Sequence, residues 1–541
     1  MKNHEETCVV NARVNTMDAD GSVQEAFSFR DGRILRVGTR DAVVSAASPG
    51  ARMIDARGAS IFPGLIDAHA HLEMLAYAWG LAVDCRSSSV SSIEEMVEKL
   101  RAHADKTRPG EWILAQGEHF QSLKLKEGRY PDRHDLDRVS DEHPIVYRSS
   151  YHLNVFNSVA LKELRVDENT PDAPGGRIER DSETGKLTGR TYDMYAPLQG
   201  PQSSVPSLVD AMCRVQEKYL SVGVTCIGEI PLHSHGLDGL LLMAAQGWGH
   251  LRAGIYPKYP TVVREADFGT RMMQEKLSGI NGDKIKLCGV KLFSDGGLTS
   301  GAAAMHDDYP GQQGYRGELT YSDDELARLV KEIDGAGFQI AIHAIGDRAL
   351  DQAIDAIAQL PADRRKSMRH RIEHAGNLFM TDERIARLAE LEIVPVPQPA
   401  FILTTAVGYR KNLGEKRTGP LMPFRKLIEA GLIIPGNSDA IGITRDQHNP
   451  FPAIQASVER RSQGGEEIEP DQAVTVEQAF RMYTNWAAYS LSWEDKMGSL
   501  EPGKVADFII LDKDPYRLPV SELKNLAVTS TYIDGELVYS A

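Results

Sequence analysis

Residues 62–71 read Phe-Pro-Gly-Leu-Ile-Asp-Ala-His-Ala-His, an apolar run that ends in two histidines, His69 and His71. In an extended strand the side chains alternate between two faces, so residues two positions apart project to the same side. Two imidazoles on one side of a strand end are a typical pair of metal ligands. A chain with 16 histidines also places two of them at this spacing by chance. The remaining strand ends must therefore decide whether a metal site exists.

Further apolar, strand-like runs alternate with amphipathic helical stretches, which is the pattern of βα units and of a parallel sheet. The runs lie at residues 60–67, 222–229, 251–257, 285–293, 338–344, 369–374, 393–398 and 432–437. Eight parallel strands can close into a TIM-type (β/α)8 barrel, whose active site lies at the carboxyl ends of the strands. We therefore predict an α/β fold built on such a barrel.

The two ends of the chain have a different sequence pattern. Short alternating segments broken by turns fill residues 7–57 and return after residue 506, which predicts strands that complete one small β-sandwich. Residues 86–202 lie outside the strand count and contain strand-like runs of their own. The predicted domains are a β-sandwich from residues 1–58 and 496–541, a barrel from residues 59–85 and 203–495, and an insertion after the first barrel strand at residues 86–202.

Composition narrows the class of protein. The chain has 541 residues, of which 42% are hydrophobic and 25% charged, as in a soluble protein with a large core. Its formal charge of -15 argues against nucleic acid or an anionic membrane as partner and favours a small-molecule substrate. The five cysteines show no CxxC spacing, so neither a disulfide framework nor a thiolate zinc site is indicated. With no signal peptide and no membrane span in the sequence, we expect a cytoplasmic protein.

Residues able to bind a metal lie at or just after the ends of four later strands of the predicted barrel, namely Lys291, His343, His374 and Asp439. Each alone is weakly specific, and Asp439 equally suits a turn or a helix N-cap in its Asn-Ser-Asp context. Candidate ligands at the ends of several parallel strands predict a metal site more specifically than any single residue does. Four histidines and a carboxylate offer nitrogen and oxygen ligands that suit zinc and, less selectively, manganese, nickel or iron.

The alternation of side chains predicts that Lys291 points into the barrel. Apolar walls disfavour a charged amine and lower its pKa, which frees it to react with carbon dioxide. The resulting carbamate can bridge two metals. The alternative is a lysine that pairs with a nearby carboxylate such as Asp295.

Together these motifs resemble the amidohydrolase superfamily, in particular amidohydrolase family 3, which includes YtcJ-like proteins and N-substituted formamide deformylases. The resemblance spans nearly the full length and is carried by residues 62–71, 289–296, 342–347, 371–374, 437–439 and 498–508. It implies a distorted barrel, a flanking β-sandwich, an insertion after the first strand and, as a family-level expectation, a homodimer. It further implies that His69 and His71 bind one metal, that His343 and His374 bind a second, that carboxylated Lys291 bridges them, and that Asp439 is both a ligand and a proton shuttle.

The same resemblance suggests residues that contact the substrate. His152 stands where the family carries a histidine followed by an Asn-Ser pair, here Asn157 and Ser158, so we expect it to bind the substrate or its oxyanion. Asp295 and the glycines after it suit a loop at the barrel mouth. Arg148 and Tyr151 are candidates of the same kind. After Asp295 the family commonly continues Ala-Leu-Gly-Ser-Arg, and the absence of that arginine argues against carrying over the family's specificity.

The expected reaction is attack of a hydroxide, held by a metal, on a carbonyl carbon that bears a nitrogen leaving group. Zinc lowers the pKa of water from about 15.7 to about 7, which corresponds to roughly 12 kcal/mol of hydroxide stabilisation. We therefore predict a hydrolase of non-peptide C-N bonds in an amide, formamide, carbamate or cyclic amide, with two zinc ions. The alternatives are a mononuclear deaminase-like enzyme or a decarboxylase or other lyase with a free Lys291, and a non-catalytic binding or regulatory protein.

Overall fold

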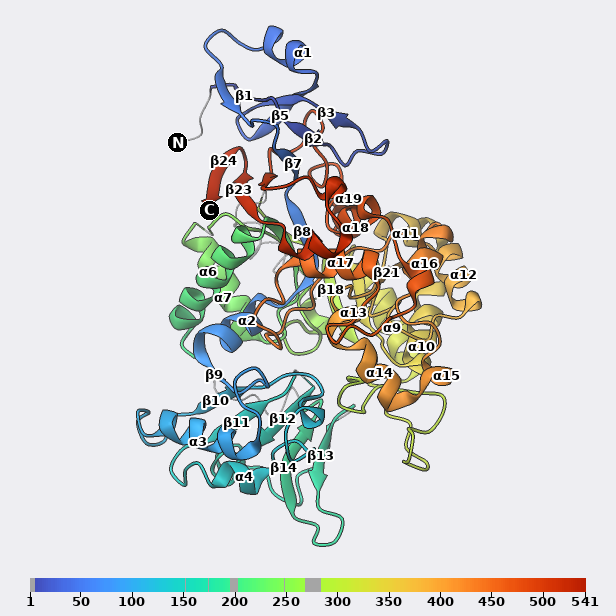
Figure 1. The fold of residues 1–541 in the computed structure, drawn as a ribbon. Helices are drawn as coiled ribbons and strands as arrows, with labels where there is room; N and C mark the ends of the chain where they lie inside the picture. The colour runs from blue at the N-terminus through green and yellow to red at the C-terminus, as the bar shows by residue number, and fades with distance from the viewer. Residues whose placement is uncertain (1–4, 151, 174, 195–202, 248, 268–283) are drawn as a thin grey trace.

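The computed structural model describes residues 5–150, 152–173, 175–194, 203–247, 249–267 and 284–541 of the chain. Figure 1 shows sheets built from both chain ends at the top, a central body of strands and helices, and the insertion at the bottom. Among the described residues, no helix has both the length and the apolar character that crossing a bilayer requires.

The central body is a TIM-barrel-like arrangement of parallel strands. They form two four-stranded sheets in chain order. The first contains β8 (Leu65–Ala70), β15 (Val224–Glu229), β16 (Arg252–Ile255) and β17 (Ile285–Leu287), and the second contains β18 (Gly289–Phe293), β19 (Gln339–His343), β20 (Arg371–Glu373) and β21 (Val394–Val396). The sheets meet at Cys288, whose N–H donates to Ile255 and whose carbonyl accepts from Gln339. The predicted fourth strand is thus divided between two sheets.

The prediction of one closed eight-stranded sheet is not met. Residues 432–437 form no strand, although Gly436 accepts a hydrogen bond from Ala68 and Asp439 donates one to His69. Pro435 has no N–H and so interrupts any regular ladder at this place. The eighth position is therefore filled by an irregular segment beside β8, which still carries Asp439 to the strand ends.

The predicted first strand is also divided. Ser60–Pro63 forms β7, which belongs to the sheet of the chain ends, and the barrel strand β8 starts at Leu65. Gly64 lies between them with its backbone against β15, because a Cβ at this position would lie 2.2 Å from Thr225 Oγ1. The close crossing requires glycine there.

The sheets of the chain ends join residues that are far apart in the sequence. One sheet consists of β1 (Thr7–Val10), β4 (Ala26–Arg30), β5 (Arg33–Gly38) and β6 (Arg52–Asp55), and the other of β2 (Arg13–Asn15), β3 (Val23–Gln24), β7, β22 (Phe508–Leu511), β23 (Val528–Ile533) and β24 (Glu536–Ser540). β7 pairs antiparallel with β22, and Phe27 meets Phe508 edge-on at 5.0 Å. That these sheets form a sandwich, and the predicted domain boundaries, stay predictions.

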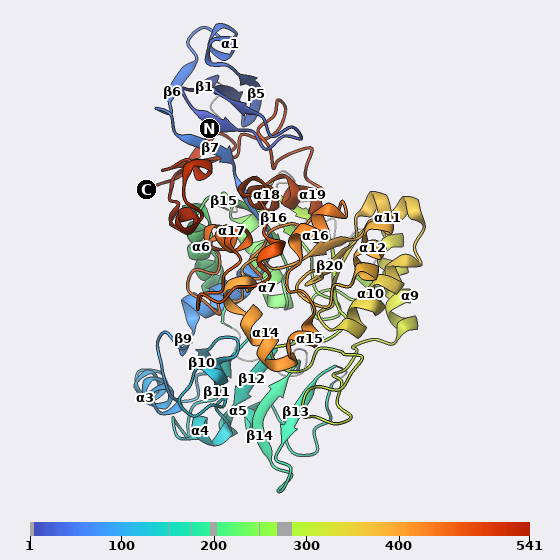
Figure 2. The same cartoon turned by 45° about the vertical axis from the view of Figure 1, so that its right-hand side comes forward.

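The insertion has a six-stranded sheet of its own. It consists of β9 (Val83–Asp84), β10 (Ile113–Gln116), β11 (Ile145–Arg148), β12 (Leu153–Phe156), β13 (Arg177–Arg180) and β14 (Leu187–Tyr192), with helices α3 (Ile93–Ala104), α4 (Arg133–Asp137) and α5 (Ser158–Glu163). In Figure 2 the orange helices α14 (Ala406–Leu413) and α15 (Glu415–Thr418) lie between the central body and the insertion.

Amphipathic helices surround the central strands (Figure 2). In α9 the buried side chains Leu326, Leu329, Val330 and Ile333 follow helical spacing, and Ser322 and Glu325 form a capping box at its start. The longer helices of the central body are α6 (Val205–Ser221), α7 (Ser234–Ala245), α9 (Asp323–Gly335), α10 (Asp347–Ala358), α12 (Asp382–Glu390) and α17 (Pro450–Glu459). The shorter ones are α2 (Leu72–Ala76), α11 (Ala362–Met368), α13 (Phe401–Thr404), α16 (Phe424–Glu429), α18 (Val476–Met482) and α19 (Asn485–Ser490), and α1 (Arg40–Ser45) lies against the sheets of the chain ends.

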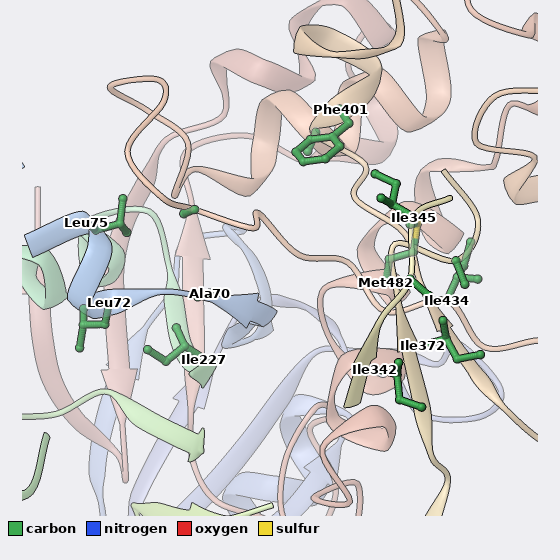
Figure 3. Close-up of a cluster of buried hydrophobic side chains, with 14 of the residues drawn as sticks. Ala70, Leu72, Leu75, Ile227, Ile342, Ile345, Ile372, Phe401, Ile434 and Met482 are labelled. Atoms are coloured by element: carbon green, nitrogen blue, oxygen red, sulfur yellow. The ribbon is translucent and has the colours of Figure 1, made fainter. Parts of the chain in front are cut away.

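One large apolar cluster holds the strands in place. Figure 3 shows Ile342 and Ile372 of neighbouring strands with Ile434 of the irregular eighth segment and Met482 of α18. Ile434 is fully buried in this cluster although its segment is no strand. Apolar packing therefore fixes the segment that leads to Asp439.

Candidate metal centre

Three predicted ligands meet at the carboxyl end of β8. The Nε2 atoms of His69 and His71 lie 3.3 Å apart, and Asp439 Oδ1 lies 3.4 Å from the first and 3.2 Å from the second. The two histidine side chains are almost completely buried, as is the edge of the sheet that bears them. This is the spacing at which one cation can contact all three atoms.

The remaining predicted ligands line the same cavity. The rings of His343 and His374 are 4.4 Å apart, and His374 is 5.7 Å from His69. Lys291 of β18 lies on the cavity wall with them. The structure thus brings all six residues together, from strand ends and from the irregular segment.

The hydrogen bonds around the histidines fix which ring nitrogen faces the cavity. The Nδ1–H of His69 donates to Glu373 (2.5 Å), that of His71 to the Ile230 carbonyl (2.9 Å), and that of His374 to Gln398 (2.7 Å). Each Nε2 therefore carries a lone pair, the form in which imidazole binds a metal.

These contacts require a positive charge between the ligand atoms. Two lone-pair nitrogens and a carboxylate oxygen at 3.2–3.4 Å are acceptors that face acceptors. Burial lowers the pKa of His69 to about 4 and that of His374 to about 3, so neither of these two rings supplies that charge by protonation at neutral pH. The donor set therefore fits a divalent metal.

Backbone strain is concentrated at two of the ligands. His374 has a φ of 73° and Asp439 a φ of 46°, in the left-handed region that residues with a Cβ seldom adopt. Such positions cost on the order of 1–3 kcal/mol each and persist where the surroundings enforce them. Here the left-handed turn occurs at residues whose side chains face the cavity.

Lys291 is a buried amine without a hydrogen-bond partner among the described residues. Burial lowers its pKa to about 8, although Glu373 and Asp439 act in the opposite direction. The alternative of an ion pair with Asp295 is not what the structure shows, because Asp295 accepts the backbone N–H groups of Ala304, Ile345 and Gly346. The lowered pKa makes the amine of Lys291 more available to carbon dioxide, and its carboxylation stays a prediction.

Sequence reasoning missed the group that holds His69. Glu373 accepts from His69 and is gripped by Arg371 through Nε (2.8 Å) and Nη2 (3.0 Å), and both side chains are fully buried. Burial alone would raise the pKa of Glu373, but Arg371 and His69 hold it well below its usual value. The i, i+2 spacing of Arg371 and Glu373, which places both on one face of β20, was the available signal.

The predicted substrate contacts fall in different places. His152 lines the cavity, with its Nδ1 held 2.6 Å from Asp193 and its ring 5.5 Å from His343. Asp295 and Arg148 do not line it. Asp295 fixes backbone turns, and Arg148 donates to Asn154 at the end of β11. Tyr151 lies outside the described residues, and these substrate roles stay predictions.

Gly297 makes room for His152. A Cβ at Gly297 would lie 2.5 Å from His152 Cγ. We expect Gly297→Ala to displace the imidazole and to lower the free energy of unfolding by about 1–3 kcal/mol, as in other overpacked sites. Denaturant unfolding and a crystal structure of the variant measure both effects. Gly335→Ala is the control, because a Cβ there would meet no described atom within 4 Å beyond its own helix; an undisplaced His152 in Gly297→Ala contradicts the prediction.

Glu229 is expected to make stability depend on pH. It is fully buried at the end of β15, Oε2 accepts from Leu72 N–H, Oε1 has no partner among the described residues, and burial raises its pKa to about 8. Between the unfolded pKa of about 4.3 and the folded value the native state binds more protons, so stability falls as pH rises, by at most about 1.4 kcal/mol per pH unit.

Glu229→Gln imitates the protonated form of this side chain. We expect the variant to match the wild type near pH 5 and to be more stable near pH 8. Urea unfolding of chelator-treated protein at both pH values measures the difference. Equal wild-type and variant stability at pH 8 would show that Glu229 titrates normally.

The chain is similar to known proteins over nearly its full length. The family model described as "Amidohydrolase family" matches residues 52–539. An N-substituted formamide deformylase from Arthrobacter pascens is 31% identical over 98% of this chain and 98% of its own length, and a putative amidohydrolase, YtcJ, from Bacillus subtilis is 27% identical over 97% and 98%. Among solved structures, a metal-dependent hydrolase of uncharacterised function from Pyrococcus horikoshii aligns over 96% of this chain and 99% of its own, with a TM-score of 0.74 and 24% identity. The likeness to the Pyrococcus horikoshii structure is evidence for the fold alone.

Proposed function

Because this chain belongs to the amidohydrolase family and is by that membership a hydrolase, we propose that it cleaves the C-N bond of a small, uncharged amide. The observation that carries the proposal is the convergence of four histidines, Asp439 and Lys291, whose amine has no hydrogen-bond partner in the described chain, in one cavity. The relative named as an N-substituted formamide deformylase makes N-substituted formamides the first candidates for the substrate.

The residues present fit two divalent metals. His69, His71 and Asp439 would hold one, His343 and His374 the other, and Lys291 as a carbamate would contact both. Such metals lower the pKa of a coordinated water to about 7 and polarise a carbonyl group. We assign zinc as the first choice because nitrogen and oxygen donors suit it, with manganese, nickel and iron as the alternatives.

Within this site Asp439 has the chemistry of a proton shuttle. Its carboxylate takes a proton from the attacking water and returns it to the nitrogen as the C-N bond breaks, so that one water is consumed and an acid and an amine leave. His152 is the candidate for binding the substrate oxygen, because it lines the cavity and Asp193 holds its Nδ1 in place.

The other lining residues favour an uncharged substituent on the substrate. Apart from Lys291 and Asp439, the described cavity wall carries no Lys, Arg, Asp or Glu. Its apolar members are Leu232, Phe293, Leu298, Ile345, Phe401 and Ile441. A charged group placed against this wall would lose its hydration without a partner.

A substrate panel tests the proposal. Purified protein loaded with zinc is offered N-alkylformamides, N-arylformamides, N-acyl amines and carbamates, and we expect release of an amine from at least one neutral class. A chelator should abolish turnover and zinc should restore it, with two metals per chain by elemental analysis. Absence of hydrolysis across the panel by metal-replete protein would contradict it.

The state of Lys291 separates this proposal from its nearest competitor. Native mass spectrometry or a crystal structure of metal-replete protein should show one added carbon dioxide on this side chain. An unmodified Lys291 beside a single metal would favour the deaminase-like or lyase chemistry instead.

A further inference from the structure

The cavity wall carries two further polar side chains, Tyr409 and His119. Tyr409 of α14 lines the cavity and is 1% exposed. His119, which follows β10 of the insertion, lines it too, and its Nδ1 is buried without a partner. Buried polar groups are nearly always hydrogen-bonded in native proteins. The Nδ1 of His119, buried on the same cavity wall as Tyr409 and without a partner among the described residues, therefore points to a ligand that satisfies it.

Aromatic packing between the insertion and the central body brings the two residues to the same wall. The ring of Phe120 meets Tyr409 edge-on at 6.4 Å, and the ring of His119 meets Phe401 of α13 at 6.2 Å. The contact is close because residue 408 is glycine, where a Cβ would lie 2.4 Å from Phe120 Cε2. The insertion is thus part of the cavity wall.

The two side chains offer complementary hydrogen-bonding groups. Burial and the nearby charge of Asp439 raise the pKa of Tyr409, so its hydroxyl stays protonated and donates. Burial lowers the pKa of His119 to about 4, so its imidazole is neutral at pH 7 and keeps one nitrogen that accepts. One donor and one acceptor match a secondary amide, which has one carbonyl oxygen and one N–H.

We propose that Tyr409 and His119 bind the amide group of the substrate, with the Tyr409 hydroxyl donating to the carbonyl oxygen and His119 accepting the amide N–H. This inference rests on the proposed function and narrows it to secondary amides. A tertiary amide has no N–H, so it makes only the contact with Tyr409. The pair, with one residue from α14 and one from the insertion, therefore determines the preference for secondary over tertiary amides.

Paired substrates test the two contacts separately. The probes are N-cyclohexylformamide and its N-methyl derivative. We expect Tyr409→Phe to lower kcat/KM for both by about tenfold, the usual effect of one lost hydrogen bond in a buried site. His119→Phe should lower kcat/KM about tenfold for the secondary formamide and leave the tertiary one within twofold. Wild-type values for either variant with both probes overturn the inference.

Binding provides a readout that needs no turnover. Benzohydroxamic acid carries a carbonyl group and an N–H, and its affinity for metal-loaded protein is measured by calorimetry. Both variants should bind it about tenfold more weakly than the wild type, with metal content unchanged. A protein that hydrolyses no compound of the substrate panel yet shows these losses refutes the proposed function and supports the inference. Unchanged affinities overturn the inference.

Two more variants control for folding. Tyr532→Phe removes a hydroxyl from a tyrosine that stacks on Phe508 in the sheets of the chain ends, and it should leave kcat/KM and affinity unchanged. If either cavity variant does not fold, Gly408→Ala carries the test, because it keeps both polar groups but pushes α14 away from Phe120. We expect it to lower the affinity for the hydroxamate at least threefold, and an unchanged affinity contradicts the inference.

Discussion

Asp439→Asn is expected to lower kcat by about 10³-fold, because general acid-base groups contribute roughly 10²–10⁴-fold and an amide cannot accept the proton of the attacking water. The carboxylate oxygen lies within 3.4 Å of the Nε2 atoms of both His69 and His71, so the same change also weakens the metal site. Steady-state kinetics combined with elemental analysis separates the two effects. The expected result is a metal-loaded, folded and inactive protein.

A matched variant serves as the control for this result. Asp446→Asn makes the same chemical change at an exposed residue a few positions further along the chain and should leave kcat unchanged. Metal-loaded Asp439→Asn with kcat within tenfold of the wild type would remove Asp439 from the role of proton shuttle.

Glu373→Gln is expected to have the largest effect on stability. The carboxylate forms an ion pair with the buried Arg371 guanidinium and holds the Nδ1–H of His69. Removal of one partner from a buried ion pair costs about 3–5 kcal/mol, because the other charge remains desolvated. Loss of the support for a metal ligand typically lowers metal affinity by about 10–100-fold. Urea unfolding and a competition titration with a zinc chelator measure these two losses.

The double variant Arg371→Met/Glu373→Gln tests the explanation. It leaves no unpaired charge, so it should recover much of the lost stability while metal affinity stays low. The pKa of Glu373 is depressed, so in the wild type its contribution is present above the unfolded pKa of about 4.3 and is lost as pH falls toward the folded value. The free energy of unfolding of Glu373→Gln should lack this pH-dependent contribution. If the single variant were as stable as the wild type, the ion pair would have no structural role.

The sequence alone identified the family to which the chain belongs and part of the cavity lining, namely His69, His71, His152, Lys291, His343, His374 and Asp439. Strand periodicity and the chemistry of His, Lys and Asp are local properties, so they predict which side of a strand a residue faces and what it can bind. The order of the parallel strands followed from the alternation of strand-like and helical runs. The amidohydrolase resemblance carried by residues 62–71, 289–296 and the later motifs is confirmed by the family model over residues 52–539.

Tertiary structure decided the rest. His69 and Glu373 are 304 positions apart, and His71 and Asp439 are 368 apart, so no local pattern links them. The predicted fourth strand is divided at Cys288, and the segment at Pro435 is irregular. Both features depend on how each segment pairs with its neighbouring strands. The meeting of His119 with the wall that carries Tyr409 depends on how the insertion packs on α13 and α14. Sequence periodicity states which way a side chain points, whereas only packing between distant segments determines what it meets.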